Sequence, residues 1–549
     1  MALQMSYKSL INEMKGRDTT NKWDVIVAYN EDKINNLLAQ LYHDKPLNFE
    51  FKAPYEDPLT GDKNDLDVRI TLNKPVLEFS SNEGRADLTY DLTGDYGPKR
   101  LPIPDGTKMR IRVDIANLQG HTTTKPGDSG FKPTQKALHP ATPLERSKQR
   151  ANYVVSVDGD NAAQGVCIVF RDAMISISNP DPQYNARISM ISSLVVPWTT
   201  NEFNKSDYYY FIGGTGVSSS RTRDTTVVTL EPTHFCFTMV QSKTRYNLTG
   251  ALVMWIAVKG GRAPELGPGS YTFQPRDRNL NPIPSGKTAS IIFRHDIMAD
   301  LFFKRALEAK FRNVKILSRV GSEGITLKGG LMNESVHLKA YRNSYKCGLF
   351  NEKVCTETFD PVDVDCDSPD TEIHIKPMID TGDAIKLSYR SEKHDCEWVS
   401  FAGSGMPAYS TMQIRFKWTG AGAWTDETSP DKPNNIQIRF DSTNDWKVEA
   451  SGRIPPWWNP SSPDDLPDYF DKLKMTVDVQ IPMATLDYFL TTNLLFPGRQ
   501  IFIADPVKPP NADYESGLAV PRDLILTGNV AESLDAARSG RPVSRVSSL

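Results

Sequence analysis

Alternation of apolar and polar positions dominates this chain. The clearest examples are the segments 65–72, 108–115, 412–418, 435–440 and 472–481, in which every second residue is apolar. A period of two is the pattern of strands that are buried on one face only. One-sided burial is typical of antiparallel sheets, and Gly, Pro, Asn and Asp separate the segments as turn residues do. The pattern therefore predicts a mostly antiparallel β protein.

Three segments have the spacing of amphipathic helices instead. The first follows the apolar strand at 23–29, and Asn30 can cap its N-terminus. Two more are predicted at 295–311 and, with a weaker pattern, at 483–496. The apolar stripe of the first helix recurs at i, i+3, i+4, i+7 and i+8 and consists of Ile34, Leu37, Leu38, Leu41 and Tyr42.

The first two helical segments also resemble each other. A shift of 264 positions lays Asp32 over Asp296 and Leu37 over Leu301, and each helix follows a short β-branched strand. We infer a duplicated unit of one long helix and a curved antiparallel sheet, an α+β fold. The predicted units are 1–280, with a long polar loop at about 121–149, and 281–530, with a possible insertion at about 340–400. Residues 531–549 are predicted to be a disordered tail.

Charge and hydropathy exclude several classes of protein. The 549 residues carry 64 basic and 67 acidic side chains, a net charge of −3, which gives no global attraction to nucleic acid. The sequence has no run of 18 apolar residues, so no transmembrane segment is predicted. The N-terminus lacks the apolar core of a Sec signal peptide. We therefore expect a cytoplasmic protein, or one secreted without such a peptide.

The six cysteines fall into two groups. Cys167 and Cys236 lie in apolar strand-like runs and are predicted to be buried thiols. The other four lie in one irregular region, near His374 and His394. No C-x-x-C pair supports zinc, and disulfides are not the default without a signal peptide. Free thiols, disulfides or a bound metal therefore stay open for Cys347, Cys355, Cys366 and Cys396.

No catalytic or cofactor motif is complete. The word at 286–288, Gly-Lys-Thr, ends like a phosphate loop, but the glycine required five residues earlier is replaced by Asn281 and a strand follows. We predict a turn there, no catalytic residues, no metal and no cofactor. An enzyme with a site assembled only by folding is the remote alternative. Adjacent aromatic residues at Trp457 and Trp458 are candidates for membrane contact, or for a loop that closes over the core.

Several short segments of the sequence resemble those of a known protein family. The duplicated helix-and-sheet pattern resembles the tubular lipid-binding (TULIP) superfamily. "WDVIVAYNEDKINNLL", "IPSGKTASIIFRHDIMADLFF" and "TTNLLFPGRQIF" are similar to words of the clostridial neurotoxin-cluster accessory proteins of the forty-seven-kilodalton type. These words, with "VPRDLILTGNV", spread from about residue 23 to 530. The resemblance implies a helix wrapped by a bent sheet, an apolar groove, and a lipid or phosphoinositide as partner, with a toxin-cluster protein as a further one.

The hypothesis that follows is a non-enzymatic lipid-binding protein. The alternative is a structural or protein-interaction module on the same fold, whose core is closed and holds no ligand. An apolar sheet face packs a core before it lines a pocket, so both stay open at each position. The predicted groove residues are Ile34, Leu37, Leu38, Leu41, Ile111, Val113, Met298, Leu301 and Phe302.

Overall fold

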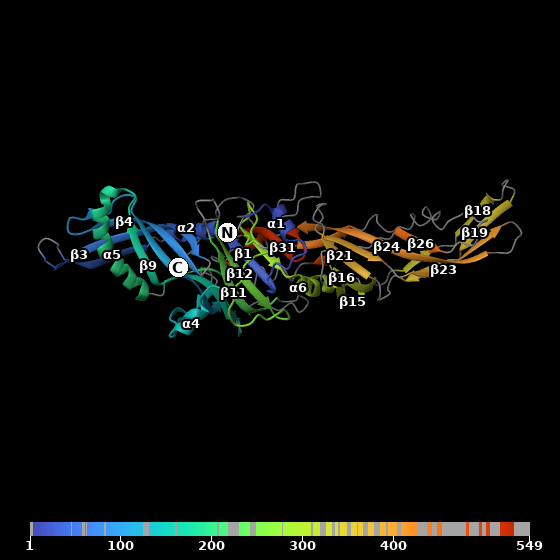
Figure 1. Ribbon diagram of the computed structural model, residues 1–549, viewed down its shortest axis with the longest axis horizontal. Coiled ribbons are helices and arrows are strands. Elements are labelled where there is room, and N and C mark those ends of the chain that lie inside the picture. Colours follow the sequence, from blue (N-terminus) through green and yellow to red (C-terminus); the bar gives the residue numbers. More distant parts are fainter. Residues whose placement is uncertain are drawn as a thin grey trace.

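The computed structural model describes residues 4–531 with gaps. The omitted internal segments of four or more residues are 57–60, 124–130, 218–229, 242–248, 319–324, 348–352, 366–371, 378–384, 403–407, 427–435, 442–446, 453–478, 483–493, 497–500 and 506–516. The molecule is elongated, with three antiparallel sheets that follow one another along its long axis (Figure 1). We call them the N-terminal, central and C-terminal sheets. The mostly antiparallel α+β fold predicted from the sequence is confirmed.

The central sheet joins strands that are far apart in the sequence. Its order is β13-β8-β11-β12-β1-β14-β31-β29, with β30 paired to β31. Its strands are β1 (Val25–Asn30), β8 (Tyr153–Ser156), β11 (Pro232–Val240), β12 (Ala251–Val258), β13 (Gly267–Pro268), β14 (Ala289–Phe293), β29 (Ile501–Ala504), β30 (Leu518–Ala519) and β31 (Leu524–Ala531). Strands from both sides of residue 280 therefore share one sheet, and the division into units at that residue stays a prediction.

The N-terminal sheet has the order β2-β3-β4-β6-β9-β10-β28, with β5 paired to β4 and β7 to β6. Its strands are β2 (Leu47–Glu56), β3 (Lys63–Ser81), β4 (Arg85–Tyr96), β5 (Leu101–Pro102), β6 (Lys108–Thr122), β7 (Phe131–Pro133), β9 (Ala162–Ser178), β10 (Tyr209–Gly216) and β28 (Leu494–Leu495). The alternation predicted for the strands at 65–72 and 108–115 is confirmed, because Val68, Ile70, Ile111 and Val113 are at most 1% exposed.

The C-terminal sheet begins at β15 and holds the remaining long strands. They are β15 (Phe311–Ser318), β16 (Ile325–Leu331), β18 (Tyr341–Cys347), β19 (Lys353–Phe359), β21 (Glu372–Pro377), β22 (Ile385–Arg390), β23 (His394–Ala402), β24 (Ala408–Asp426), β25 (Ile436–Asp441), β26 (Lys447–Gly452) and β27 (Val479–Pro482). A separate pair is formed by β17 (Ser335–Leu338) and β20 (Val362–Asp365). The region 340–400, predicted as a possible insertion, contributes strands to this sheet.

The described helices are short, apart from α5 with 21 residues and α2 with 14. They are α1 (Tyr7–Met14), α2 (Glu31–Asp44), α3 (Gln135–Leu138), α4 (Pro143–Lys148), the 3₁₀ turn η1 (Pro182–Tyr184), α5 (Asn185–Lys205), α6 (His295–Ile297), the π-helical η3 (Met298–Phe303) and α7 (Lys304–Leu307). The helix predicted at 295–311 is therefore present but contains a π-helical turn and ends before β15. Of the third predicted helix, residues 483–493 lie outside the described residues, and 494–495 form a strand.

The long helix α5 lies against a curved sheet. Both β2 and β9 contact α5, although β3, β4 and β6 separate those two strands in the order of the sheet. A flat sheet would hold β2 and β9 four strand spacings, about 19 Å, apart. The single ring of Phe203, however, lies 6.3 Å from Phe49 of β2 and 5.0 Å from Phe170 of β9, which requires the sheet to curve. The Trp198 ring of α5 stacks on Phe51 of β2 at 4.0 Å, and Phe203 packs against Phe170 of β9 at 5.0 Å. The sheet therefore wraps around α5.

The opening helix α2 is fixed at both its N-terminus and its side by hydrogen bonds. The carboxamide Oδ1 of Asn30 accepts a hydrogen bond from the Lys33 N–H, which confirms the predicted cap. The Asn35 carboxamide exchanges two hydrogen bonds with the backbone of Leu77 in β3, and Glu31 Oε2 accepts one from the Phe79 N–H. These bonds hold α2 along β3, and Ile34 and Leu38 of its apolar stripe lie in the same buried cluster as the core residues of α5.

Strands β1 and β14 meet in a symmetric register. Val27 lies directly opposite Ile291, its partner in the 264-residue shift. The Asn30 N–H donates to the Thr288 carbonyl at 2.9 Å, and at the other end the Arg294 N–H donates to the Asp24 carbonyl at 2.8 Å. Such a register is that of two equivalent strands related by a local two-fold rotation.

A buried carboxyl links the two ends of the described chain. The Asp523 side chain accepts hydrogen bonds from the Thr19 N–H, the Thr19 hydroxyl and the His295 N–H, at 2.8, 2.8 and 2.9 Å. Asp523 is only 1% exposed, and burial raises its pKa from 3.8 to about 6. Between pH 3.8 and about 6, the Asp523 carboxyl is therefore protonated in the native state but ionised in the unfolded state.

The pH dependence of stability follows from this shift. A raised native pKa contributes stability that is fully present below pH 4 and is lost as the pH rises through 6. A shift of two units corresponds to about 3 kcal/mol. The Asp523→Asn variant lacks this carboxyl. We therefore expect its free energy of unfolding in urea, relative to that of wild type, to rise by about that much between pH 4 and pH 7. A constant difference across this range would show that Asp523 does not titrate in the native state.

Candidate functional site

Most of the predicted groove residues are packed in the core. Ile34, Leu38, Ile111, Val113 and Met298 are at most 1% exposed and belong to a single apolar cluster that extends through all three sheets. Leu37 is 7% exposed. They are packed in this cluster, and their role in binding a lipid stays a prediction. Close packing of this kind stabilises the fold whether or not a ligand binds.

Other predicted positions lie outside the described residues. The side chains of Leu41, Leu301 and Phe302 are among them, as are Trp457 and Trp458. Cys366 and the side chains of Cys347, Cys355 and Cys396 are outside as well. Cys167 and Cys236 are confirmed as buried free thiols, and burial raises the pKa of both.

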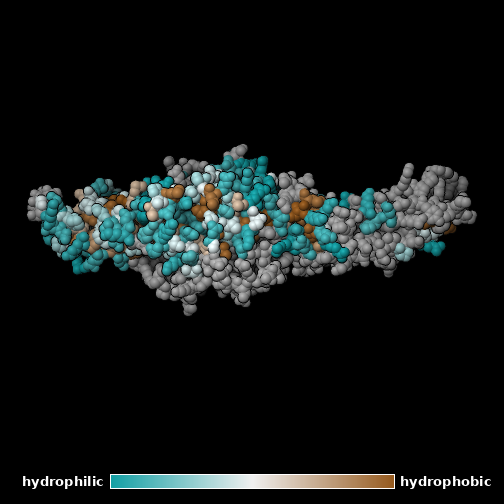
Figure 2. All heavy atoms as spheres, turned by 90° about the horizontal axis from the view of Figure 1, so that it is seen from below, coloured by the Kyte–Doolittle hydropathy of each residue, from teal (hydrophilic) through white to brown (hydrophobic). Residues whose placement is uncertain are grey.

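The surface gives little sign of a long apolar groove on the face seen in Figure 2. Described residues there are mainly hydrophilic, and hydrophobic ones form separate small patches. The exposed large apolar side chains are scattered over distant elements, for example Val76 in β3, Met174 in β9 and Leu317 in β15. Scattered apolar residues are normal for a protein surface. Among the described residues, no helix is long and apolar enough to cross a membrane.

A polar pocket lies where the polar loop predicted at 121–149 folds back. Phe131 of β7 anchors this segment: its ring stacks on Phe211 at 5.0 Å and covers two glycines of the N-terminal sheet. A Cβ on Gly165 or Gly120 would lie 2.5 or 2.7 Å from that ring. Such contacts are too close for any side chain, so the glycines make room for Phe131. Part of the predicted loop therefore forms regular secondary structure that packs against the N-terminal sheet.

Two short helices complete the segment. Thr134 caps α3 by accepting a hydrogen bond from the Ala137 N–H at 3.2 Å. Thr142 and Glu145 form a capping box at the start of α4. Glu145 also lies 3.1 Å from the Lys136 ammonium. That ammonium, with the Ala141 and Thr142 N–H groups, lowers the pKa of the Glu145 carboxyl. Helix α3 contacts β6 and α4 contacts β8, so the helices span the junction of two sheets.

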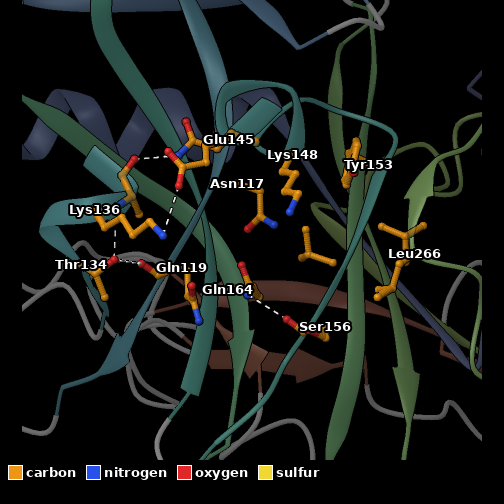
Figure 3. Close-up of a pocket in the computed structure, with 14 residues that line it drawn as sticks. Asn117, Gln119, Thr134, Lys136, Glu145, Lys148, Tyr153, Ser156, Gln164 and Leu266 are labelled. Carbon is orange, nitrogen blue, oxygen red and sulfur yellow. Dashed lines mark hydrogen bonds and ion pairs between the residues drawn. The ribbon is translucent and has the colours of Figure 1, made fainter. Parts of the chain in front are cut away.

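The pocket between these elements has a volume of about 400 Å³. Strand β6 contributes Asn117 and Gln119, and β9 contributes Gln164. The β8 side contributes a short run, 153–156, and the two helices contribute Lys136, Glu145 and Lys148. Figure 3 shows these side chains around one cavity, with Leu266 at its rim. The lining therefore combines amides, hydroxyls and charged groups with an apolar wall.

Two side chains of this lining have unused hydrogen-bonding capacity. Asn117 is only 4% exposed, and its Oδ1 atom is buried with no hydrogen-bond partner. Among the described residues, no carboxylate pairs with Lys148, whereas Lys136 pairs with Glu145. A buried amide without a partner is uncommon and costs free energy. The pocket therefore presents one buried acceptor without a partner, Asn117 Oδ1, and one exposed ammonium group, that of Lys148.

The sequence analysis did not predict this pocket. Its residues come from positions as far apart as 117 and 266, and most of them are ordinary polar residues of a loop or of a strand face. The available signals were the capping-box word Thr142-Pro-Leu-Glu145 and the glycines at 120 and 165 in otherwise apolar strands. They indicate local structure but not the cavity that this structure encloses.

These elements define an α+β protein in which a curved antiparallel sheet wraps a long helix. No protein-family model and no curated protein matches the sequence. Among solved structures, the chain is similar to P47 from Clostridium botulinum A2, with 9% identity and a TM-score of 0.44 over 94% of this chain and 98% of that one. It is similar to P47 of Clostridium botulinum E1, with 10% identity and the same score over 93% and 99%. A lipopolysaccharide binding protein is similar with 9% identity and a TM-score of 0.26 over 93% and 99%.

Proposed function

We propose that this chain is a non-enzymatic lipid-binding protein whose N-terminal sheet and α5 form the lipid compartment. The observation that supports this most is the packing of one α5 residue, Phe203, against both β2 and β9, because it requires the sheet to curve around the helix. The space between this sheet and α5 is filled by aliphatic and aromatic side chains, including Ile191, Leu194 and Phe203 of α5, which are at most 3% exposed. An apolar interior enclosed by strands is the environment that acyl chains require.

The acyl chains would enter beside α5. Trp198 of α5 and Phe49 of β2 are only half-buried and form an edge-to-face pair at 5.4 Å. They lie at the open edge of the sheet, because β2 is its terminal strand. Shifting this pair breaks fewer contacts than opening the core, so we place the entry there.

Further details of the proposal come from the sequence resemblance. It implies a phosphoinositide among the lipids, a protein partner from a toxin cluster, and internal duplication of the helix-and-sheet unit. The symmetric register of Val27 and Ile291 supports the duplication. The second candidate function is a protein-interaction module with a closed core, which is favoured by the tight packing of the predicted groove residues.

Native mass spectrometry of the purified protein, followed by organic extraction, tests the proposal. We expect bound lipid, and about tenfold weaker lipid binding by Trp198→Ala, because one aromatic contact at the entry is worth about 1.4 kcal/mol. Met174→Ala removes an exposed apolar side chain of β9 and serves as the matched control. Absence of bound lipid, together with no binding to a panel of lipids, would favour the closed-core module.

A further inference from the structure

We propose that the free edge of β2 pairs with the same edge of a second copy of this chain, so that two N-terminal sheets form one continuous antiparallel sheet. Strand β2 is the terminal strand of its sheet and pairs with β3. Its other edge makes no backbone hydrogen bond to any described residue. Since this pairing uses the backbone of the edge, it does not depend on lipid binding.

Among the described end strands of the three sheets, β2 has the longest edge. All ten of its residues pair with β3, from Leu47 opposite Leu72 to Glu56 opposite Lys63, without a shift in register. The end strands β13, β28 and β29 have only two to four residues. Strand β18 has seven, and β15 has eight but shifts its register twice. A long, regular edge is a template for another strand, and proteins usually shorten, bend or cover such edges.

The position of Pro54 indicates which backbone groups of β2 face the free edge. Pro54 has no N–H, and a proline is tolerated in a sheet where an N–H would face away from the ladder. Successive residues of an edge strand direct their backbone groups to opposite sides. Lys52 and Glu50, two and four positions before Pro54, therefore offer their N–H and C=O groups to a partner strand. An antiparallel partner satisfies these donors and acceptors.

The charges on β2 select one register for two copies. Glu50 and Lys52 are both exposed on the outer face of the sheet. A two-fold axis through Phe51 places Glu50 of each copy opposite Lys52 of the partner subunit, whereas an axis through Glu50 or Lys52 places like charges opposite each other. An axis through Ala53 places Glu50 opposite Glu56 of the partner subunit, and an axis nearer the start of β2 pairs fewer residues. The register centred on Phe51 is therefore favoured.

Glu50 remains available for this contact although it already binds Arg69. The Arg69 guanidinium contacts Oε1 of Glu50 at 2.8 Å, and no contact to Oε2 from another described residue is formed. The Glu50 side chain is 67% exposed. The Oε2 atom can therefore accept from Lys52 of the partner subunit while Oε1 keeps its bond to Arg69.

The same register joins apolar side chains on the inner face. It places Leu47 opposite Tyr55, Phe49 opposite Ala53, and Phe51 opposite its own counterpart. Leu47, Phe49 and Tyr55 are only partly buried in one copy and pack against its core. Pairing therefore removes apolar surface from water on one face while opposite charges meet on the other.

The shape of the molecule leaves room for a second copy. Strand β3 lies toward one end of the molecule and runs along its long axis (Figure 1), and β2 pairs with β3 over its whole length. An antiparallel pair of β2 strands therefore points the rest of the two copies in opposite directions. The central and C-terminal sheets of the two copies then lie on opposite sides of the two-fold axis.

Sedimentation equilibrium of the full chain, with charge-reversal variants, tests this proposal. We expect a monomer–dimer equilibrium with a dissociation constant of about 1–100 μM. Glu50→Lys and Lys52→Glu should each weaken self-association at least about tenfold, because each variant places like charges opposite each other twice. An equimolar mixture of the two variants should associate about as tightly as wild type, because opposite charges again meet at both positions. Such recovery also shows that both variants fold.

A control and a second measurement make the outcomes decisive. Lys74→Glu makes the same charge change at an exposed position of β3 and should leave the dissociation constant unchanged. Hydrogen exchange at the Glu50 and Lys52 amides should slow as the protein concentration rises through the dissociation constant. A monomer at every concentration up to about 200 μM, above the expected dissociation constant, would overturn the second copy as the occupant, in favour of a strand from another protein. A dimer that both charge reversals leave intact, or a mixture that fails to associate, would overturn the register.

Discussion

Replacing Arg294 by methionine is expected to lower the free energy of unfolding by about 3–5 kcal/mol, measured by urea denaturation. The Arg294 guanidinium lies 2.8 Å from the Asp24 carboxylate, and the two side chains are 6% and 0% exposed. Arg294 also donates to the Lys22 carbonyl at 3.0 Å. Loss of the guanidinium leaves a charged carboxylate buried among apolar strands of the central sheet, and removing one partner of such a pair costs more than the pair contributes.

The pH dependence of this variant provides an internal check. Burial raises the pKa of Asp24, while the Val258 N–H and Arg294 lower it part of the way back. Without Arg294 the carboxyl holds its proton to a higher pH. A raised native pKa means stability that is lost as the pH rises, so the difference from wild type should be larger at pH 8 than at pH 5.

Two further variants test whether the pair, rather than general disruption, explains the effect. Asp24→Asn combined with Arg294→Met should cost less than the sum of the single changes, because neither partner is left unpaired. Arg262→Met removes a half-exposed guanidinium that pairs with Asp296 and should cost less than about 1 kcal/mol. A loss below about 1 kcal/mol for Arg294→Met would contradict the role of the pair.

Phe203→Ala is expected to lower the free energy of unfolding by about 3–5 kcal/mol. The Phe203 ring lies at the C-terminal end of α5, is 2% exposed, and packs against Phe49, Phe170 and Tyr208 at 5.0–6.3 Å. Phe49 lies on β2 and Phe170 on β9, so truncation of Phe203 leaves a cavity where these two strands approach α5. Thermal or urea unfolding measures the loss.

The same variant has a structural consequence that surface changes lack. Hydrogen exchange should become faster in α5 and β2, because contacts between them include Phe49 and Phe203. Ser193→Ala, an exposed position on the same helix, should leave both stability and exchange within about 0.5 kcal/mol of wild type. Equal effects of the two variants would show that α5 is not held by the sheet.

Some elements were predictable because their signal is local. The strand at 108–115 alternates strictly, and the structure buries Met109, Ile111, Val113 and Ile115 while β4 and β9 pair on either side. The helix at 31–44 has a cap, acidic residues in its first turn and an apolar stripe. Period and capping act between residues a few positions apart, so a sequence window contains the whole cause.

The longest helix, by contrast, was not predicted. Segment 185–205 contains Pro197, the β-branched pair Val195 and Val196, and two threonines. These residues have low helix propensity, and the stripe formed by Ile188, Ile191 and Leu194 is interrupted by serines. Burial inside the curved sheet stabilises the helix despite this composition, because most helix stability in proteins comes from tertiary packing.

The sequence by itself determined the class of fold: alternating strands predict antiparallel sheets, and the words around Asn30 and His295 predict where helices follow strands. Only the tertiary structure decided which helix the sheet wraps and where the polar groups converge. Asn117 and Lys148 are 31 positions apart and line one pocket because Phe131 packs the intervening segment on the sheet. The physical reason is that a period reports which face of an element is buried, whereas a pocket depends on distances between elements that no local pattern encodes.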